Sequence, residues 1–402
     1  MTPSLYIHIP VCLKKCDYCD FFSLPLDGLT NVGARTARET VQDRLVDGLC
    51  REITWWQERF RIEAWKTVYI GGGTPSLLSH GNIARLCAKI DTCEKKGLSS
   101  YSEWTIEANP EDITGEWLRA CTEAGINRLS IGVQSLDDAC LAAVNRRGSA
   151  EKTLAALALV SRIWKGRLSL DMIAGLPGQT AQTLVEDLSR IQAFGPDHLS
   201  LYSLTVEDGT PLSRKVRGKN GPILPNEDEA TDIWLAGRDY LRANGFTQYE
   251  VSNFCRAGSE SRHNLTYWNL ESYIGVGPGA TGTIVKNDTA TRYTDSRDIA
   301  QWLDDPEKGR ETEEIGRDES LKEVLLMGMR LASGIDKSAF RERFGYEILS
   351  CVPETAARWI RNGLLQDSGT SIALSPEGLL YLNRFLADCM KELDAVISQR
   401  NC

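Results

Sequence analysis

The sequence lacks a long apolar run, a surplus of positive charge and a recognisable export signal. A membrane-spanning helix needs about 20 consecutive apolar residues, and the 402-residue chain contains no such run. The net charge of −9 argues against nucleic-acid binding over a broad basic surface. The N-terminus shows no basic stretch followed by an apolar one, so we expect no secretory signal and a cytoplasmic location.

Cysteine, by contrast, is abundant, with 12 residues. Without an export signal, a framework of disulfides is not expected. Cys12, Cys16 and Cys19 lie close together near the N-terminus, and the other cysteines are scattered along the chain. We interpret the scattered ones as small buried hydrophobic side chains or spare thiols.

The first part of the chain alternates strand-like and helix-like segments. Six such β/α units in a row favour an α/β fold with a parallel sheet covered by helices. Right-handed crossovers curl such a sheet toward a barrel, so we predict a partial (β/α)6 TIM-like barrel over residues 1–252. Periodicity leaves an open doubly wound sheet as the alternative. The predicted strands are residues 5–9, 67–70, 104–108, 128–132, 168–173 and 198–203.

Two further regions follow the predicted barrel. Residues 253–315 are predicted to be an irregular connecting region, and residues 316–402 a small C-terminal helical or winged-helix-like domain. Its predicted elements are helices at 321–331, 337–344, 354–362 and 376–390, and a hairpin at 364–375. Winged helices often bind nucleic acid, but 11 basic and 12 acidic residues lie in 316–402. We therefore favour a packing role and expect no nucleic-acid partner.

Cys12, Cys16 and Cys19 follow directly on the first predicted strand. Three thiolates on one short loop can bind three irons of a cubane, whereas electron-transfer clusters use four cysteines. A three-cysteine loop leaves the fourth iron without a protein ligand, so that this iron can bind a substrate, as in catalytic metal sites with an open coordination position. The motif therefore predicts a [4Fe–4S] cluster. The alternatives are three unrelated cysteines, or a zinc site with His8 or a distant cysteine as fourth ligand, although no second cysteine pair is present.

The stretch from Tyr6 to Phe21, YIHIPVCLKKCDYCDF, resembles the radical S-adenosylmethionine (SAM) superfamily. More narrowly, it is similar to the HemN/HemW branch, which contains the oxygen-independent coproporphyrinogen III oxidases and heme chaperones. The likeness continues to about residue 385. It implies that the open iron takes the amino and carboxylate groups of SAM, and that a reduced cluster can cleave SAM to start radical chemistry.

A glycine-rich turn, IGGGTP at 70–75, and several polar residues at later strand ends support this resemblance. Glycines allow close approach to a ligand, and exposed N–H groups can bind a carboxylate. A polar residue in an apolar strand needs a partner, either a neighbouring loop or a ligand at the C-terminal mouth of the barrel. One of these residues, Arg146, is followed directly by Arg147, so the sequence leaves open which of the two arginines faces the ligand. The resemblance implies SAM contacts from Tyr6, Gly72, Gly73, Thr74, Glu107, Gln134, Arg146 and Asp171.

Two departures separate the chain from the oxidases of the branch. The oxidases carry a further cysteine two residues after the third ligand, where this chain has Phe21. They also have a substantial extension before the first strand, whereas only five residues precede Tyr6 here. Both departures favour the heme chaperones.

The segment RHNLTYW at 262–268 fits the His-Asn-x-x-Tyr-Trp motif of those chaperones. It lies in the glycine-rich region, where binding loops are common. The resemblance implies heme binding, with His263 as a candidate axial ligand and Trp268 as a stacking partner. Cys255 is a second candidate ligand. The alternative is that Tyr267 and Trp268 only fix this segment against the barrel.

These features predict a heme chaperone that carries a [4Fe–4S] cluster and SAM and delivers heme to heme proteins such as respiratory cytochromes. The cluster and SAM would control its assembly, with a homodimer as one form. Contact with a membrane surface is expected only if the recipient is a membrane cytochrome. The alternatives are an oxygen-independent coproporphyrinogen III oxidase and another radical SAM enzyme with an unrelated substrate.

Overall fold

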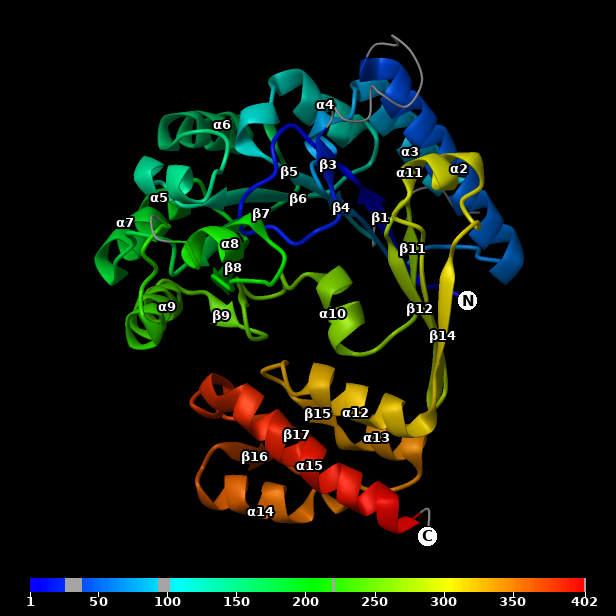
Figure 1. The fold of residues 1–402 in the computed structure, drawn as a ribbon, viewed down its shortest axis with the longest axis vertical. Helices are drawn as coiled ribbons and strands as arrows, with labels where there is room; N and C mark the ends of the chain where they lie inside the picture. Colours follow the sequence, from blue (N-terminus) through cyan, green and yellow to red (C-terminus); the bar gives the residue numbers. More distant parts are fainter. Residues whose placement is uncertain (26–37, 93–101, 219–220, 401–402) are drawn as a thin grey trace.

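The computed structural model describes residues 1–25, 38–92, 102–218 and 221–400. A large curved sheet with helices on its outer side forms the upper body in Figure 1, and a smaller, mainly helical unit lies below it. The large sheet has the strand order β14-β13-β12-β11-β1-β4-β5-β6-β7-β8-β10-β9.

Six neighbouring strands of this sheet are parallel and follow one another in chain order. A doubly wound sheet reverses its strand order at a switch point. These six strands run in one direction without such a reversal, so the predicted (β/α)6 partial barrel is confirmed. The six strands are β1 (Ser4–Ile9), β4 (Thr67–Gly72), β5 (Glu103–Ala108), β6 (Arg128–Gln134), β7 (Arg167–Ala174) and β8 (His198–Ser203).

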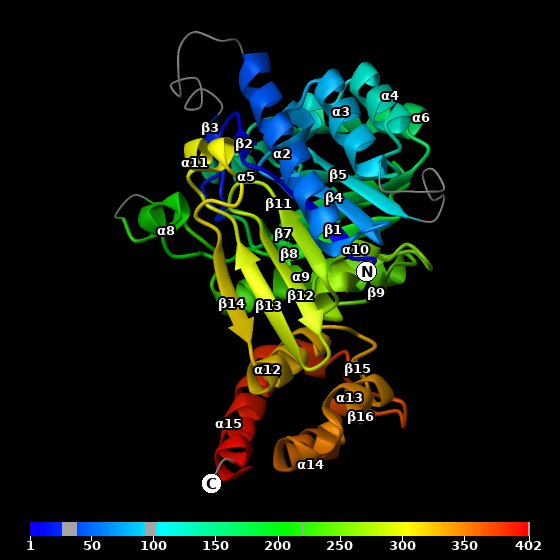
Figure 2. The same cartoon turned by 90° about the vertical axis from the view of Figure 1, so that its right-hand side faces the viewer.

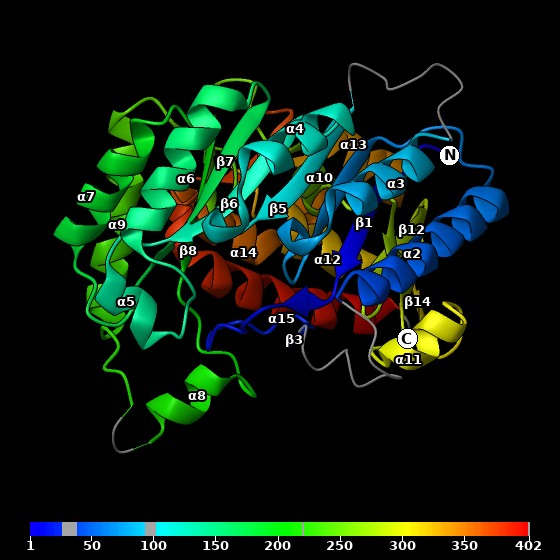
Figure 3. The same cartoon turned by 90° about the horizontal axis from the view of Figure 1, so that it is seen from above.

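The helices cover the outer side of the curved sheet, as the view from above shows (Figure 3). Successive strand residues face opposite sides, which is why Leu5, Ile7 and Ile9 lie in the apolar core while Tyr6 and His8 face the interior. The covering helices are α2 (Arg38–Phe60), α3 (His80–Asp91), α4 (Gly115–Glu123), α6 (Ala150–Ile163), α7 (Ala181–Gln192) and α9 (Glu227–Ala243). The shorter α5 (Asp138–Ala143) and α8 (Pro211–Val216) lie nearer the carboxyl ends of the parallel strands.

Residues 253–315 are not irregular, and that expectation was wrong. They extend the sheet on both sides, and β11 pairs in parallel with β1. Asn287, with φ of +52°, makes the turn of the β12–β13 hairpin, and asparagine tolerates this left-handed conformation. The elements are β10 (Asn253–Cys255), α10 (Arg262–Trp268), β11 (Tyr273–Val276), β12 (Thr281–Lys286), β13 (Thr289–Thr294), α11 (Ile299–Asp304) and β14 (Glu311–Ile315), with β9 (Thr247–Gln248) just before them.

The C-terminal unit has its own cluster of buried apolar side chains, which runs from Leu321 to Leu393 and is separate from the barrel core. Figure 2 shows it below the β12–β14 strands. A small sheet of order β15-β17-β16 lies among its helices. The elements are α12 (Arg317–Gly328), β15 (Ile335–Asp336), α13 (Lys337–Phe344), α14 (Pro353–Arg361), β16 (Leu365–Asp367), β17 (Ser371–Leu374) and α15 (Leu382–Arg400). The predicted helices and hairpin are thus present, and the three domain boundaries stay predictions.

The C-terminal unit meets the barrel at a short seam. Val251 N donates to Arg330 O at 3.1 Å, and the Arg330 guanidinium lies 5.7 Å from the Trp268 ring. Within the described ranges, we find no helix with both the length and the apolar character needed to cross a membrane.

Candidate functional site

A cavity of about 420 Å³ opens at the carboxyl ends of the parallel strands and reaches down into the barrel. The loop that follows β1 forms one of its walls with residues between Cys12 and Phe21. The two-residue strands β2 (Val11–Cys12) and β3 (Leu24–Pro25) pair with each other at the two ends of this loop. Two predicted site residues, Tyr6 and His263, are not among those that line the cavity. The predicted residues that do line it are Cys12, Cys16, Cys19, Gly72, Gly73, Thr74, Glu107, Gln134, Arg146 and Asp171.

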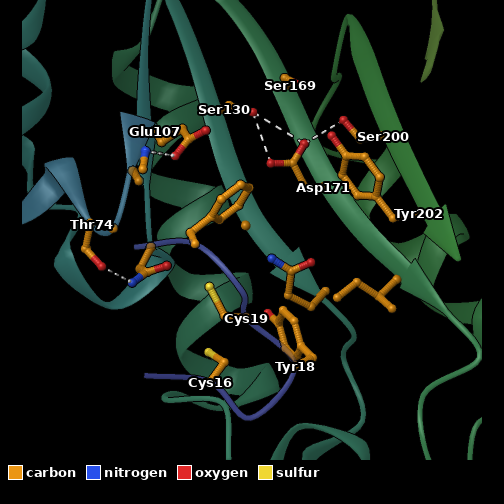
Figure 4. A pocket seen from close by; sticks show the side chains of 18 of the residues that line it. Cys16, Tyr18, Cys19, Thr74, Glu107, Ser130, Ser169, Asp171, Ser200 and Tyr202 are labelled. Atoms are coloured by element: carbon orange, nitrogen blue, oxygen red, sulfur yellow. Dashed lines mark hydrogen bonds between the residues drawn. The ribbon is translucent and has the colours of Figure 1, made fainter. Parts of the chain in front are cut away.

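The three clustered cysteines share this wall of the cavity, and Figure 4 shows two of them, Cys16 and Cys19. Cys16 is buried, and Cys12 and Cys19 are partly exposed. Burial is the main cause that raises the pKa of Cys19 to about 11, and Lys15 acts in the opposite direction. Because metal binding requires the thiolate, a bound iron would replace this proton.

The surroundings of these thiols bear on the alternative of a single zinc ion. In the described part of the chain, no group of three His, Cys, Asp or Glu side chains could hold one metal ion. His8, the candidate fourth ligand of a zinc site, has both ring nitrogens engaged. Its Nε2 lies 2.7 Å from Phe22 O and its Nδ1 lies 2.9 Å from Tyr6 Oη. A carbonyl oxygen can only accept, so Nε2 carries the proton and Nδ1 accepts from the phenol.

Hydrogen bonds from neighbouring loops hold two of the sulfurs. Thr74 Oγ1 donates to Cys12 Sγ at 3.3 Å, and Arg146 Nη1 approaches Cys16 Sγ at 3.7 Å. Asn109 connects the two, because it donates to Thr74 and accepts from Arg146 Nη2 at 2.9 Å. This network fixes the side chains of Cys12 and Cys16 on the cavity wall.

Arg146, and not Arg147, faces the cavity. Arg147 instead pairs with Asp112 and with Glu111 outside the lining. The structure therefore brings Arg146 alone to the position that the sequence left open.

The glycine-rich turn at the end of β4 passes close to the cluster loop. Gly72 has φ of +105°, and a Cβ there would lie 2.5 Å from the His8 ring. A Cβ on Gly73 would lie 2.6 Å from Val11 O and 2.7 Å from Ile9 O. Gly72 therefore needs glycine because of its positive φ and the adjacent His8 ring, and Gly73 because backbone carbonyls lie directly against it.

Two carboxyl groups face the cavity from neighbouring parts of the sheet. Glu107 accepts from Tyr69 Oη at 2.7 Å and from Gly72 N at 3.1 Å, and burial raises its pKa to about 7. Asp171 is held by two hydroxyl groups (Figure 4), with Ser200 Oγ at 2.7 Å and Ser130 Oγ at 3.1 Å. Burial raises the pKa of Asp171 also. Such carboxyl groups can accept from the hydroxyl or amino groups of a polar ligand.

Gln134 is directed by a backbone irregularity. It has φ of +70°, and the register between β6 and β7 shifts between Gly132 and Gln134. A bulge next to a cavity re-aims a side chain at a cost in backbone strain. The bulge directs the Gln134 side chain to the cavity wall, next to Arg146.

The His-Asn-x-x-Tyr-Trp segment forms α10, which lies on the other side of the barrel from β2 and β3 (Figure 2). His263 is buried, and both of its ring nitrogens have partners, Thr67 Oγ1 at 2.7 Å and Tyr267 Oη at 2.8 Å. Burial lowers its pKa to about 3. Cys255 is also buried, which raises the pKa of its thiol to about 12. Heme ligation by either residue stays a prediction, and would require opening of this packing.

Sequence reasoning missed the residues that support the predicted ones. Asn109 links two loops, Tyr69 holds Glu107, and Ser130 and Ser200 hold Asp171. The strand alternation carried this signal, since Tyr69, Ser130 and Ser200 occupy inward positions of β4, β6 and β8.

Two family models and several known proteins match this chain. A family model described as the radical SAM superfamily matches residues 6–191, and one described as the HemN C-terminal domain matches residues 315–381. The heme chaperone HemW of Bacillus subtilis (strain 168) is 33% identical over 97% of this chain and 100% of its own length. The mitochondrial radical S-adenosyl methionine domain-containing protein 1 of Mus musculus is 34% identical over 99% of this chain and 89% of its own.

Among solved structures, coproporphyrinogen III oxidase (HemN) from Escherichia coli superposes with a TM-score of 0.78. It is 21% identical, and the match covers 96% of this chain and 90% of that one, so it shows the shared fold. The chain belongs to the radical SAM superfamily. Within it, this is a HemW-like protein, and membership implies a [4Fe–4S] cluster and SAM.

Proposed function

We propose that this protein is a heme chaperone that binds heme and delivers it to heme proteins, with a [4Fe–4S] cluster on Cys12, Cys16 and Cys19 and SAM beside it. Relatives named heme chaperones match it over nearly its whole length. The three thiols that face one cavity and the Gly72–Gly73 cradle fit the two cofactors.

The residue at position 21 is the observation that favours a chaperone over an oxidase. The resemblance gives the oxidases a further cysteine at this position, and here a phenyl ring stands there, 60% exposed at the cavity wall.

The chain's own residues would bind and orient these groups. When bound and reduced, the cluster and SAM supply one-electron cleavage of a sulfonium, and the protein supplies placement. Arg146 holds Cys16 and lies against the carbonyl of Gly132, while Glu107 and Asp171 offer acceptors on the cavity wall. The peptide N–H groups of the glycine turn can bind a carboxylate.

The proposal also covers the recipients of the heme, the oligomeric state and the cellular location. The recipients would be heme proteins such as respiratory cytochromes, with membrane contact only where the recipient is itself in a membrane. A homodimer controlled by the cluster and SAM is part of the proposal. So is a cytoplasmic location, because an oxygen-sensitive cluster needs a reducing compartment.

One experiment separates the chaperone from the oxidase. The protein is purified without oxygen, its cluster is reconstituted, and it is offered heme and coproporphyrinogen III in parallel in the presence of SAM. We expect a stoichiometric Soret band with heme and no protoporphyrinogen from coproporphyrinogen III. Substrate-dependent release of 5′-deoxyadenosine together with protoporphyrinogen would contradict the chaperone and support the oxidase. Release with a different substrate would support another radical SAM enzyme.

A further inference from the structure

Asn109 stands at the start of a short helix but does not cap it. It follows β5 and is the N-cap residue of the 3-10 helix Pro110–Asp112. Asparagine is favoured at this position because its side chain can accept from the first backbone N–H groups of the helix. The side chain of Asn109 makes no such bond and lines the barrel cavity instead. A polar side chain that gives up its local partner needs another one, and both partners of Asn109 also line the cavity.

The two ends of the Asn109 amide face different loops. Its Oδ1 accepts from Arg146 Nη2 at 2.9 Å, and its Nδ2 donates to Thr74 Oγ1 at 3.4 Å. A guanidinium can only donate, so the amide oxygen must face Arg146 and the amide nitrogen must face Thr74. The backbone is held separately, because Asn109 N donates to Ser76 Oγ at 3.2 Å. The amide therefore has one orientation, and it joins the loop that follows β4 to the loop that follows α5.

Each partner of Asn109 in turn donates to a sulfur of the cluster loop. Thr74 Oγ1 donates to Cys12 Sγ at 3.3 Å. The Thr74 hydroxyl has a single proton, and because its oxygen already accepts from Asn109, this proton is left for the sulfur. Arg146 Nη1 donates to Cys16 Sγ at 3.7 Å, while its Nη2 is held by Asn109. One amide thus fixes the direction of two donors.

Donors of this kind have a known effect on iron–sulfur clusters. Hydrogen bonds to the cluster sulfurs are among the features that set the reduction potential. Reduction adds one negative charge to the cluster, so O–H and N–H groups and a nearby cation stabilise the reduced form more than the oxidised form. The reduction potential is therefore higher with these donors in place than without them.

We propose that Asn109 is a positioning residue that raises the reduction potential of the cluster, because it holds the two side chains that donate to its cysteine sulfurs. This inference rests on the proposed function only for the cluster on Cys12, Cys16 and Cys19, and it is independent of heme as the cargo. A higher potential lets a weaker electron donor reduce the cluster. Asn109 would in this way set how readily the protein reaches the reduced state.

The test is the midpoint potential of the reconstituted cluster, measured by redox titration with EPR detection on the full-length protein without SAM. Asn109→Ala should lower the equilibrium constant for one-electron reduction by about tenfold, equivalent to a shift of ~59 mV to more negative potential. Asn145→Gly is the matched control. Asn145 Nδ2 donates to Lys15 O at 3.4 Å, which is a backbone atom of the same loop and not a sulfur, and glycine tolerates the φ of +57° at this position. The potential of Asn145→Gly should equal that of the wild type.

A double variant shows whether Asn109 acts through Thr74. Thr74→Val keeps the shape of the side chain and removes the donor to Cys12, so it should also lower the potential, and it serves as the test where Asn109→Ala takes up too little cluster to titrate. In the double variant the shift should be smaller than the sum of the two single shifts, because residues in one network are not additive.

The outcomes separate this inference from the proposed function. A wild-type potential in Asn109→Ala or in Thr74→Val, an equal shift in Asn145→Gly, or fully additive shifts would overturn the role of Asn109 while the cluster assignment stands. If the wild-type protein takes up no [4Fe–4S] cluster, the cofactor part of the proposed function itself fails.

Discussion

His263 Nδ1 lies 2.7 Å from Thr67 Oγ1, and this contact joins α10 to the first residue of β4 inside the barrel. The other ring nitrogen lies 2.8 Å from Tyr267 Oη, and the imidazole stacks on Tyr69 with 5.0 Å between ring centroids. The ring is therefore held on three sides, as a structural residue would be.

His263→Ala should destabilise the protein. The change leaves the hydroxyl of Tyr267 without its partner in a buried place, which costs about 1–3 kcal/mol, whereas Thr67 Oγ1 keeps its hydrogen bond to Ser4 Oγ. Urea unfolding of the cluster-free protein measures the loss, and His80→Ala, at an exposed position on α3, should leave the midpoint nearly unchanged. The same variant tests the ligand predicted from sequence. A hemin complex whose spectrum changes in His263→Ala, at a temperature where the variant is folded, would support His263 as the ligand.

The barrel strands and the cysteine motif could be predicted from the sequence, whereas the contacts of His263 and Ser200 could not. The barrel strands were predictable because each is a short apolar run bounded by turns, and the cysteine spacing depends on local sequence alone. The position of His263 was not predictable, because its partner Thr67 lies 196 residues away in the chain. The same holds for Ser200, which reaches Asp171 only after β7 and β8 pair. Local patterns define elements, and the pairing of strands decides which polar groups satisfy one another.

Each of the three clustered cysteines should be necessary for the cluster. Changing Cys12, Cys16 or Cys19 to alanine removes one of the thiolates that would bind an iron, so reconstituted protein should lose the [4Fe–4S] absorption and most of its iron and sulfide. Cys50→Ala is the matched control, because Cys50 is also partly exposed but lies on α2 and does not line the cavity. If Cys50→Ala loses as much iron as the other three variants, the assignment of the ligands is wrong.

Gly73→Ala should weaken SAM binding and cluster loading together. The added Cβ would lie 2.6 Å from Val11 O and 2.7 Å from Ile9 O, so the backbone that leads into the cluster loop must move. Equilibrium binding of SAM to reconstituted protein should show an affinity loss of about tenfold or more, equivalent to ~1.4 kcal/mol.

Gly81→Ala is the control for this substitution. Gly81 lies in α3, and a Cβ there meets nothing within 4 Å. Alanine is favoured over glycine within a helix by roughly 0.5–1 kcal/mol, so this variant should be slightly more stable and bind SAM as wild type does. Equal SAM affinity in Gly73→Ala and Gly81→Ala would contradict a role for the glycine turn in holding SAM.

Glu107 should make the stability of the cluster-free protein fall as the pH rises from about 4.5 to 7. Burial raises its pKa from 4.5 to about 7, so across this range the folded protein retains a proton that the unfolded chain has released. Where the folded state binds more protons, the free energy of unfolding decreases with pH, here by at most about 3 kcal/mol. Glu107→Gln cannot titrate and should remove this part of the slope in urea unfolding measured at a series of pH values. Glu250, also buried and with its pKa raised to about 7, should contribute a similar part, so Glu250→Gln serves for comparison and the double variant should lose both parts of the slope. A wild-type slope in Glu107→Gln would show that the carboxyl is already ionised in the folded protein at low pH.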